Sequence, residues 1–365
     1  MSIRELVTDF ESLGNNCEFG IVQRFFGAEP LSLLRWAGID RIEMLINALH
    51  GRFRGLGEVE NVAYELPAGW DHPAAIDRRY GFYFHTDLDA SGVLQQPDEL
   101  LKLKTLEGRR LKFLAAKLFV LLQTGEKVLV YLQKNAAARS EIDRLFDAIR
   151  DYGRNTLLVV IEDPSRDAGS VEVRKDGLIE AYVPHLSNSN PPRIDFEAWQ
   201  RIIAEAHEIW SVARKQLSAR AVYLPPFQRA MTALGFIGDA ELRMRVLDPL
   251  VRQYASSIFD FSWYIGKYPD IRAALAEGLI AQEHFWRHGY YEDRLPAPFV
   301  VDEDWYLKTY GDVTALVEQG AVGSASDHYQ RSGYFEGKAP NSRVYPFAQM
   351  WNEVFEINLR VSEPP

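Results

Sequence analysis

The sequence predicts an α/β fold in the N-terminal part of the chain, with a helix-covered, partly parallel sheet, and an all-α repeat domain in the C-terminal part. Short runs of β-branched and aromatic residues alternate with longer amphipathic segments up to about residue 218. After residue 257 the strand-like runs stop and one aromatic pattern occurs twice. We therefore expect an α/β domain over 1–218, a helical connector over 219–256, a two-copy repeat domain over 257–342 and a C-terminal tail over 343–365.

The elements of the first part follow an order that is typical of α/β domains. Helices are expected where apolar residues recur every three or four positions, and strands where short β-branched or aromatic runs end at turn residues. Because strands and helices alternate, part of the sheet is expected to be parallel. In chain order we expect a helix after residue 17, a helix over 40–49, an aromatic strand over 79–87, a helix over 100–123, a strand over 127–132, a helix over 140–152, strands over 156–161 and 178–183, and a helix over 196–217.

The Pro225-Pro226 step marks the boundary between this domain and the next part. Helical pieces then run over 227–254. They have apolar faces, which favours a connector packed against neighbouring structure over a free linker.

An internal repeat covers residues 258–340. The copies match at an offset of 42 residues and, after a two-residue insertion, at an offset of 44. Each copy reads as an aromatic segment, a helix, a turn and a second helix, and we expect both to bury their aromatic side chains, with Trp263 and Trp305 in equivalent buried places. The matched pairs are Trp263 and Trp305, Tyr264 and Tyr306, Tyr268 and Tyr310, Asp270 and Asp312, Gly278 and Gly320, His284 and His328, Gly289 and Gly333, Tyr290 and Tyr334, Glu292 and Glu336, and Pro296 and Pro340.

The paired histidines His284 and His328 invite a comparison with metal ligands. Two histidines without carboxylate or thiolate partners make a poor metal site. Because they occupy matching positions of the two copies, a stacking or capping hydrogen bond explains both. We therefore expect no metal there.

The repeat resembles modules attached to bacterial glycosyltransferases and other surface-polysaccharide proteins. Those modules carry Tyr-Pro-Asp and, further on, histidine, glycine and glutamate. The first copy keeps Tyr268-Pro269-Asp270, whereas the second has Gly311 in place of the proline. The resemblance implies a glycan, nucleotide-sugar or lipid-linked sugar precursor as ligand, and protein partners that bind through the repeats.

Composition and charge exclude several classes of protein. The net charge of −10 lacks the basic footprint that nucleic-acid binding needs. The single cysteine permits no disulfide within the chain, so nothing indicates an oxidising compartment. The first ten residues show no secretory signal, and no apolar run is long enough to span a membrane. We expect a soluble, cytoplasmic protein.

That single cysteine, Cys17, is the best candidate nucleophile. It follows the turn residues Gly14-Asn15-Asn16 and precedes a helical pattern. At a helix N-terminus, free N–H groups and the helix dipole stabilise an anion, so we expect a lowered pKa for the thiol. The alternative is a small buried side chain without chemistry.

The segment Ser-Leu-Gly-Asn-Asn-Cys over residues 12–17 resembles the opening motif of a bacterial family of papain-like cysteine peptidases of unknown function. That family continues with a helix, a glycine turn and a Pro-Phe-Asp-Trp-like segment. Here Pro30 and Trp36 are kept, but the Phe-Asp pair is missing. The resemblance implies a Cys–His catalytic site.

A cysteine nucleophile needs a base, usually histidine, and often a third group that orients it. We expect His85 to be the base, because it ends an aromatic strand and the family has a similar His-Asp pair there. Asp87 falls on the same face and would hold the imidazole. His185, which also ends a strand, is the reserve. Asn15, Asn16 and the N–H of Cys17 are candidate oxyanion donors, although turn formation explains both asparagines more simply.

The sequence therefore favours thiol-dependent acyl transfer or hydrolysis in bacterial surface-polysaccharide biosynthesis. A coenzyme A thioester is a possible acyl donor, and its phosphates would need basic contacts. The alternative is a glycosyltransferase, or a non-catalytic glycan-binding or scaffold protein, for which the acidic strand ends Glu162 and Asp163 would suit a nucleotide-sugar site. The candidate basic residues are Arg24, Arg35, Arg109, Arg110 and Lys112.

Overall fold

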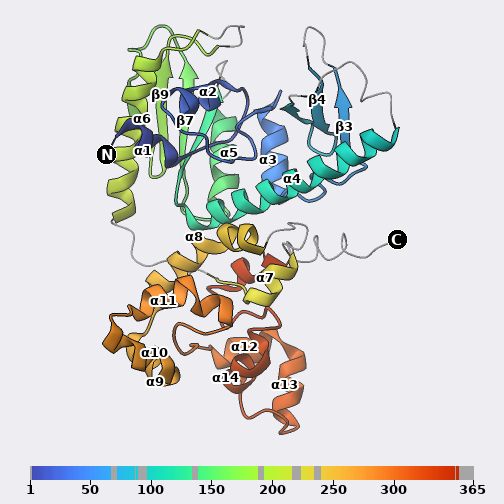
Figure 1. The fold of residues 1–365 in the computed structure, drawn as a ribbon, viewed down its shortest axis with the longest axis vertical. Coiled ribbons are helices and arrows are strands. Elements are labelled where there is room, and N and C mark those ends of the chain that lie inside the picture. Colours follow the sequence, from blue (N-terminus) through green and yellow to red (C-terminus); the bar gives the residue numbers. More distant parts are fainter. Residues whose placement is uncertain are drawn as a thin grey trace. The chain divides into compact units, whose positions relative to one another are not determined.

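The chain consists of two units. The computed structural model describes residues 2–66, 72–86, 88, 97–133, 139–187, 193–215, 223–233, 240–349 and 351–352. Unit 1 comprises Met1–Leu217 and unit 2 comprises Ser218–Pro365. Unit 1 is mixed α/β and the described part of unit 2 is helical, which confirms the predicted fold class (Figure 1). No described helix is long and apolar enough to cross a membrane.

Unit 1 is built on a five-stranded sheet, sheet A. Its spatial order is β1 (Phe10–Ser12), β6 (Val128–Gln133), β7 (Thr156–Glu162), β9 (Leu178–Val183) and β8 (Val171–Lys175). The first four strands run parallel, whereas β8 pairs antiparallel with β9. The carboxyl ends of the parallel strands therefore meet at one edge, which is where ligands bind in open α/β sheets.

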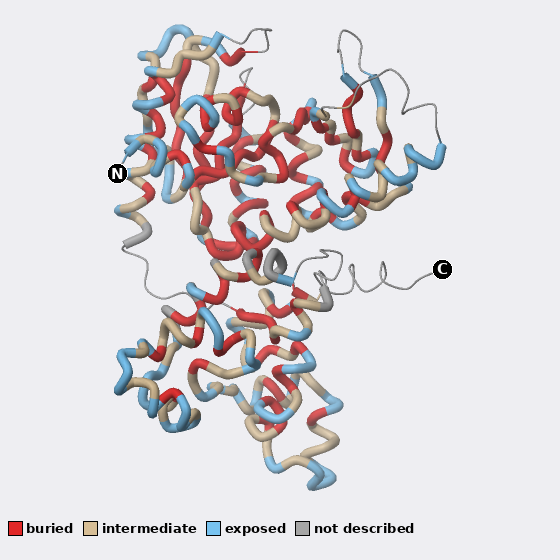
Figure 2. The backbone as a smooth tube through the Cα atoms, viewed as in Figure 1, coloured by how far each residue is buried: buried red, intermediate tan, exposed pale blue. Residues whose placement is uncertain are grey.

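Helices cover sheet A, which explains why its central strands are mostly apolar. Every residue of β6 and β9 is buried, and Figure 2 shows buried backbone running through the sheet and its neighbouring helices. Helices α1 (Ile3–Thr8), α2 (Glu18–Phe25) and α6 (Phe196–Lys215) share one hydrophobic core with the strands. Helix α5 (Arg139–Arg150) crosses from β6 to β7 and contacts α3 (Ile42–His50).

A second, antiparallel sheet, sheet B, was not expected from the sequence. Its order is β2 (Ala37–Gly38), β5 (Phe82–His85), β4 (Ala74–Asp77) and β3 (Val62–Glu65). Only β5 was expected, as part of the aromatic strand over 79–87. Strands this short carry too few residues to show an alternating pattern. Helix α4 (Pro97–Thr124) contacts β3 and leads into β6.

Unit 2 begins with the connector helices α7 (Phe227–Ala233) and α8 (Ala240–Ile258). The first repeat contains α9 (Phe261–Lys267), α10 (Pro269–Ala274), η2 (Leu275–Glu277), α11 (Ala281–Arg287) and η3 (Gly289–Glu292). The second repeat contains α12 (Glu303–Thr309), α13 (Gly311–Glu318), α14 (Ala325–His328) and η4 (Tyr329–Gly333). Most of the expected tail over 343–365 lies outside the described residues.

The two repeats share their internal contacts. Asp260 and Asp302 each cap the first helix of their copy, by accepting hydrogen bonds from Trp263 N–H and Trp305 N–H. The hydroxyl of Tyr268 accepts a bond from the N–H of Leu295 at 2.8 Å. The equivalent Tyr310 hydroxyl accepts from Ala339 N–H, also at 2.8 Å. The sequence repeat is thus a structural repeat.

One expectation about the repeats is wrong in detail. Trp263 and Trp305 occupy equivalent places, but both are half-buried, and the fully buried residues are the neighbouring Tyr264 and Tyr306. Each tyrosine hydroxyl forms a 3.1 Å hydrogen bond with Nδ1 of the matched histidine, His284 or His328. The hydrogen-bonded role expected for these histidines is confirmed. The paired tyrosine and histidine positions of the sequence therefore form the polar centre of each copy.

Candidate functional site

Cys17 lies in the turn that leaves β1 at the carboxyl edge of sheet A. Gly14 and Asn15 adopt positive φ angles of 84° and 81°, a conformation that glycine and asparagine tolerate best. The side-chain amide of Asn15 donates a hydrogen bond to the Leu132 carbonyl at the end of β6. This turn makes Cys17 the N-cap residue of α2, so its expected position at the start of a helix is confirmed.

The two asparagines form the turn, as the simpler interpretation predicts. Asn15 fixes the turn to β6, and Asn16 Oδ1 accepts a hydrogen bond from the Glu18 N–H at 2.8 Å. This contact caps the first turn of α2. Because it uses only the carbonyl oxygen of the amide, the role of Asn16 Nδ2 as an oxyanion donor stays a prediction.

Burial rather than the helix dipole decides the state of the Cys17 thiol. The side chain is partly exposed, and desolvation raises its pKa to about 11. The expected lowering of the pKa is therefore wrong. Cys17 precedes the first helical residue, and its side chain makes no capping hydrogen bond that would oppose this rise. At neutral pH the thiol is protonated.

The Cys17 turn packs on the segment over residues 34–39. Gly14 and Gly20 stand on either side of Cys17, and each comes close to this segment. A Cβ atom on Gly14 would lie 2.9 Å from Cδ1 of Ile39, and one on Gly20 would lie 3.0 Å from the Trp36 ring. Strand β2 lies between Trp36 and Ile39 in the sequence and pairs with β5. Cys17 is therefore placed beside the β2–β5 strand pair.

Tyr83 of β5 lies close to Cys17. It is opposite Gly38 of β2, where a Cβ atom would lie only 1.8 Å from the tyrosine ring. The Tyr83 hydroxyl donates a hydrogen bond to Asp40 Oδ1 at 3.0 Å. Burial raises the pKa of Tyr83 to about 12, and Asp40 and the negative charge of a Cys17 thiolate add to the rise. A charge effect of this kind indicates that the two side chains lie within range of an electrostatic interaction.

His85 ends β5, which confirms its expected place at a strand end. It follows Tyr83 by two positions, so both side chains emerge on the face opposite the buried phenylalanines of the strand. Burial lowers the pKa of His85 below the ordinary 6.5, so its imidazole is neutral at pH 7 and able to accept a proton. Asp87 lies outside the described residues. The pairing of His85 with Cys17, and the support from Asp87, stay predictions.

Glu18, directly after Cys17, is a buried carboxyl that the sequence pattern did not predict. It is 2% exposed. Its Oε2 accepts a hydrogen bond from the Ser187 N–H at 2.5 Å, and its Oε1 accepts one from Trp199 Nε1 at 2.8 Å. Burial raises the pKa of Glu18, while these hydrogen bonds oppose the rise. Glu18 therefore ties the first turn of α2 to the segment after β9 and to α6.

The reserve base, His185, belongs to that same segment after β9. Its Nε2 is 2.7 Å from the carbonyl oxygen of Arg193, and its electrostatic interaction with Glu18 lowers the pKa of that carboxyl. Glu162 Oε2, at the end of β7, accepts a hydrogen bond from the Leu186 N–H at 2.7 Å. A structural role in holding this segment explains both His185 and Glu162.

Glu162 and Asp163, the acidic pair considered for a nucleotide-sugar site, both accept hydrogen bonds from nearby residues. Glu162 bonds to the backbone of the β9 segment. Asp163 Oδ1 accepts hydrogen bonds from Ser165 N–H at 2.9 Å and from Ser165 Oγ at 2.6 Å. These contacts close the turn after β7. They lower the availability of both carboxylates for a metal or a sugar.

Four of the five basic residues considered for coenzyme A phosphates have acidic partners. Arg35 is 3% exposed, pairs with Glu29 at 2.5 Å and lies over the Trp36 ring at 4.7 Å. Arg24 also pairs with Glu29 at 2.5 Å and lies over Trp36 at 4.8 Å. Both guanidinium groups lie over the Trp36 ring, so this tryptophan, which is shared with the peptidase family, has a structural role. The remaining contacts are Arg110 with Glu107 at 2.6 Å and Lys112 with Glu58 at 3.2 Å, whereas the exposed Arg109 has no ion pair among the described residues.

No family model, curated protein or solved structure matches this chain. The resemblance to cysteine peptidases, carried by residues 12–17, and the resemblance of the repeats therefore stay predictions. In the part of the chain that the structure describes, no group of three or more histidine, cysteine, aspartate or glutamate residues is placed to hold a metal ion.

Proposed function

We propose that this protein catalyses thiol-dependent acyl transfer or hydrolysis, with Cys17 as nucleophile and His85 as base. One observation supports this more than any other. The chain around Cys17 packs on the residues that flank β2, and β2 pairs with the strand that presents Tyr83 and His85 on one face. The site lies at the carboxyl edge of sheet A, where ligands of α/β domains bind.

The pKa directions define how such a site would work. Burial raises the pKa of Cys17 to about 11 and lowers that of His85, so both groups are neutral at pH 7. A preformed thiolate–imidazolium pair is therefore disfavoured. Instead His85 acts as a general base during attack, as histidine does for a serine nucleophile.

In the first step Cys17 Sγ attacks the carbonyl carbon of a thioester, and the thiol proton moves to His85. The carbon–sulfur bond to the leaving group breaks, and the leaving thiolate takes the proton from His85. In the second step a sugar hydroxyl or water gives its proton to His85 and attacks the acyl-enzyme. The acyl–Sγ bond breaks and Cys17 regains the proton. Exclusion of water favours the sugar over hydrolysis.

The substrate class rests on the resemblances. The repeats are similar to modules of surface-polysaccharide proteins, so the acceptor proposed is a glycan, nucleotide-sugar or lipid-linked sugar precursor in the cytoplasm. The acyl donor proposed is a coenzyme A thioester. Of the basic residues considered, the exposed Arg109 is the one without an ion pair among the described residues, so its guanidinium is the most available for a phosphate.

One observation favours the alternative function. A thiol with a pKa of about 11 is a weak nucleophile unless a base assists it. In a non-catalytic glycan-binding or scaffold protein, Cys17 would be a partly buried side chain at the start of α2 that takes no part in chemistry. A Cys17→Ala variant that restores polysaccharide synthesis in a deficient strain as well as the unmodified protein does would support this alternative and reject covalent catalysis.

A direct test of the proposed function is to trap the acyl-enzyme. Since the chain has one cysteine, any thioester on cysteine must be on Cys17. The full chain is incubated with short-chain acyl-coenzyme A at pH 7 and quenched, and its mass is measured. We expect a hydroxylamine-sensitive acyl adduct that is absent in Cys17→Ala. Absence of the adduct across a series of acyl lengths would contradict the proposal.

A further inference from the structure

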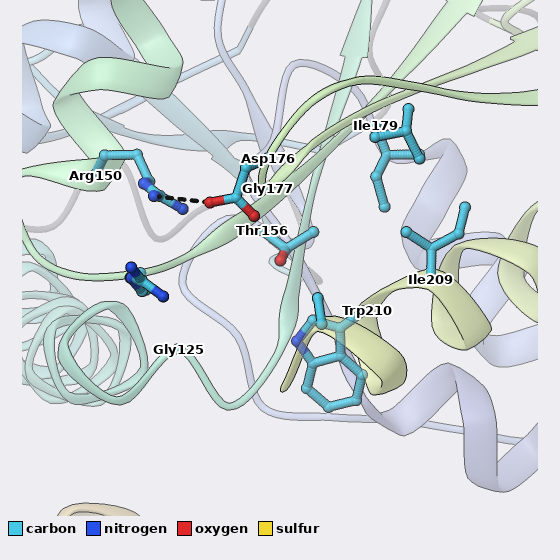
Figure 3. A pocket seen from close by; sticks show the side chains of 11 residues that line it. Gly125, Arg150, Thr156, Asp176, Gly177, Ile179, Ile209 and Trp210 are labelled. Carbon is cyan, nitrogen blue, oxygen red and sulfur yellow. Dashed lines mark hydrogen bonds and ion pairs between the residues drawn. The ribbon is translucent and has the colours of Figure 1, made fainter. Parts of the chain in front are cut away.

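A pocket lies at the edge of sheet A opposite to Cys17, beside the amino ends of β7 and β9. It has a volume of about 60 Å³. Its walls come from the start of β7 at Thr156, from the β8–β9 turn at Gly177, and from the C-terminal parts of α5 and α6 (Figure 3). No part of the proposed Cys17 site contributes to it.

One wall of the pocket is apolar. Ile179 of β9, with Ile209 and Trp210 of α6, lines this wall, and Figure 3 shows the three side chains converging on the same space. Trp210 is 6% exposed, so its indole is held in place by packing. A ligand that fills this part gains from burying aliphatic surface.

The opposite wall is cationic. Arg150 forms a 3.4 Å ion pair with Asp176, whose side chain is 78% exposed, and donates to the Asn155 carbonyl at 3.3 Å. Both contacts are long, and an exposed pair of this kind contributes little energy. Arg154 is exposed and has no ion pair among the described residues. Two arginines and one aspartate give this wall a net charge of +1.

The backbone around the pocket is closely packed. A Cβ atom on Gly125 would lie 2.7 Å from the Arg154 carbonyl oxygen, and one on Gly177 would lie 2.7 Å from the Arg150 guanidinium and 2.9 Å from the Asn155 carbonyl oxygen. Both glycines have positive φ, 63° and 80°. The segment over residues 150–155, which carries both arginines, is thus packed closely against Gly125 and Gly177, so the pocket is preformed.

We infer that this pocket binds a short-chain organic carboxylate, with the carboxylate on Arg154 and Arg150 and the alkyl chain against Ile179, Ile209 and Trp210. The guanidinium group matches a carboxylate in a bidentate fork. Since one water occupies roughly 10–15 Å³ of such volume, the pocket admits about four to six non-hydrogen atoms, which is the size of butyrate. The inference does not depend on the proposed activity of Cys17.

The test uses the full chain and sodium butyrate at constant ionic strength. Butyrate does not absorb near 280 nm, so a change in Trp210 emission is obtained by subtracting the titration of Trp210→Phe from that of the unmodified protein. Ligand-observed NMR measures binding independently for every variant. We expect saturable binding with a dissociation constant on the order of millimolar, as suits a ligand of this size.

Two comparisons decide whether the pocket is responsible. Arg154→Gln should weaken butyrate binding at least tenfold, whereas Arg139→Gln, an exposed arginine at the other end of α5, should leave it unchanged. Uncharged butyramide should bind at least tenfold more weakly than butyrate. Inorganic phosphate should not compete, because it lacks the alkyl chain.

Three results would overturn the inference. These are the absence of saturation up to about 50 mM butyrate, an affinity that Arg154→Gln leaves unchanged, and competition by phosphate at the same concentration as butyrate, which would indicate a site for any anion. Circular dichroism of each variant separates loss of the pocket from loss of the fold.

Discussion

The polar side chains near Cys17 differ between the sheet A side, where they form hydrogen bonds inside the protein, and the sheet B side, where they lie on an accessible face. On the sheet A side, Asn15, Glu18 and Glu162 direct their polar atoms at backbone groups or at another buried side chain. On the sheet B side, Tyr83 and His85 emerge from β5 on the face that is not buried. The first group holds the chain around Cys17, and the second offers groups that a bound molecule can reach.

The two groups of side chains should therefore contribute to different properties, the first to stability and the second to catalysis. A polar group that satisfies buried donors is measured best by the free energy of unfolding. A group on an accessible face, with its pKa shifted by burial, is measured best by activity and its pH dependence. Variants on the two sides of Cys17 should therefore affect different quantities.

The largest expected effect distinguishes the two histidines. His85→Ala should reduce acyl-enzyme formation by about 10²- to 10⁴-fold, the usual contribution of a general base, while the thermal unfolding midpoint stays within a few degrees. His185→Ala should reduce the rate less than about threefold, because the His185 ring is bonded to the Arg193 carbonyl. Single-turnover kinetics with an acyl thioester measure both. The opposite ranking would move the base to the sheet A side.

Glu18→Ala should be the most destabilising change on the sheet A side. It leaves the Ser187 N–H and Trp199 Nε1–H without their acceptor in a buried place, which costs about 2–4 kcal/mol of unfolding free energy. Glu172→Ala, in the exposed ion pair with Arg166 on β8, should cost about 0.5 kcal/mol or less. Urea denaturation measures both. Equal effects of the two substitutions would contradict the structural role of Glu18.

The same carboxyl gives a pH dependence with a defined sign. Because burial raises the folded-state pKa of Glu18 above its unfolded value of about 4.3, the folded chain holds this proton more tightly than the unfolded chain. The stabilisation that comes from binding this proton is therefore full below the unfolded pKa and is lost as the pH rises through the folded pKa, whereas the two hydrogen bonds that the carboxyl accepts are a separate contribution. Unfolding free energies measured from pH 4 to 7 should fall in the unmodified protein relative to Glu18→Ala. A parallel pH dependence of the two proteins would contradict this.

A smaller effect is expected for Tyr83. Tyr83→Ala removes a ring beside Cys17 and lets in water, so the alkylation midpoint of the thiol should fall by about one pH unit from about 11. Tyr83→Phe keeps the ring and removes the bond to Asp40, so it should shift the midpoint by less. Iodoacetamide alkylation followed by mass spectrometry gives both values. A larger shift for Tyr83→Phe would show that the hydroxyl, not burial, controls the thiol.

The sequence predicted most of the fold because its long elements carry strong periodic patterns. The strands expected over 127–132, 156–161 and 178–183 are β6, β7 and β9, and the repeat spacing predicted matching helices. Sheet B was missed because its strands have two to four residues. In the repeats, the matched positions predicted equivalent places for the two tryptophans, but the fully buried residues are the neighbouring Tyr264 and Tyr306, which form hydrogen bonds with histidine.

The site was less predictable because its properties depend on burial. The sequence placed Cys17 correctly at a helix start, yet the direction of its pKa shift depends on how much solvent reaches the thiol, which no local pattern shows. Glu18 reads as an ordinary acidic residue in a first helical turn, but Trp199 and Ser187, far away in the sequence, make it a buried acceptor. A glutamate directly after the candidate nucleophile was the one available signal.

The most direct test of the account is the pH dependence of acyl-enzyme formation at Cys17. If neutral His85 removes the proton from a neutral thiol, the rate should rise through the pKa of His85, below 6.5, and then stay level through neutral pH. The rate should show no inflection at about 8.5, which is the pKa of an unperturbed thiol. His85→Ala should remove the plateau and leave a rate that rises toward pH 11. A rate that follows thiol ionisation in both proteins would contradict the role of His85, and the absence of any acyl-enzyme would contradict the role of Cys17.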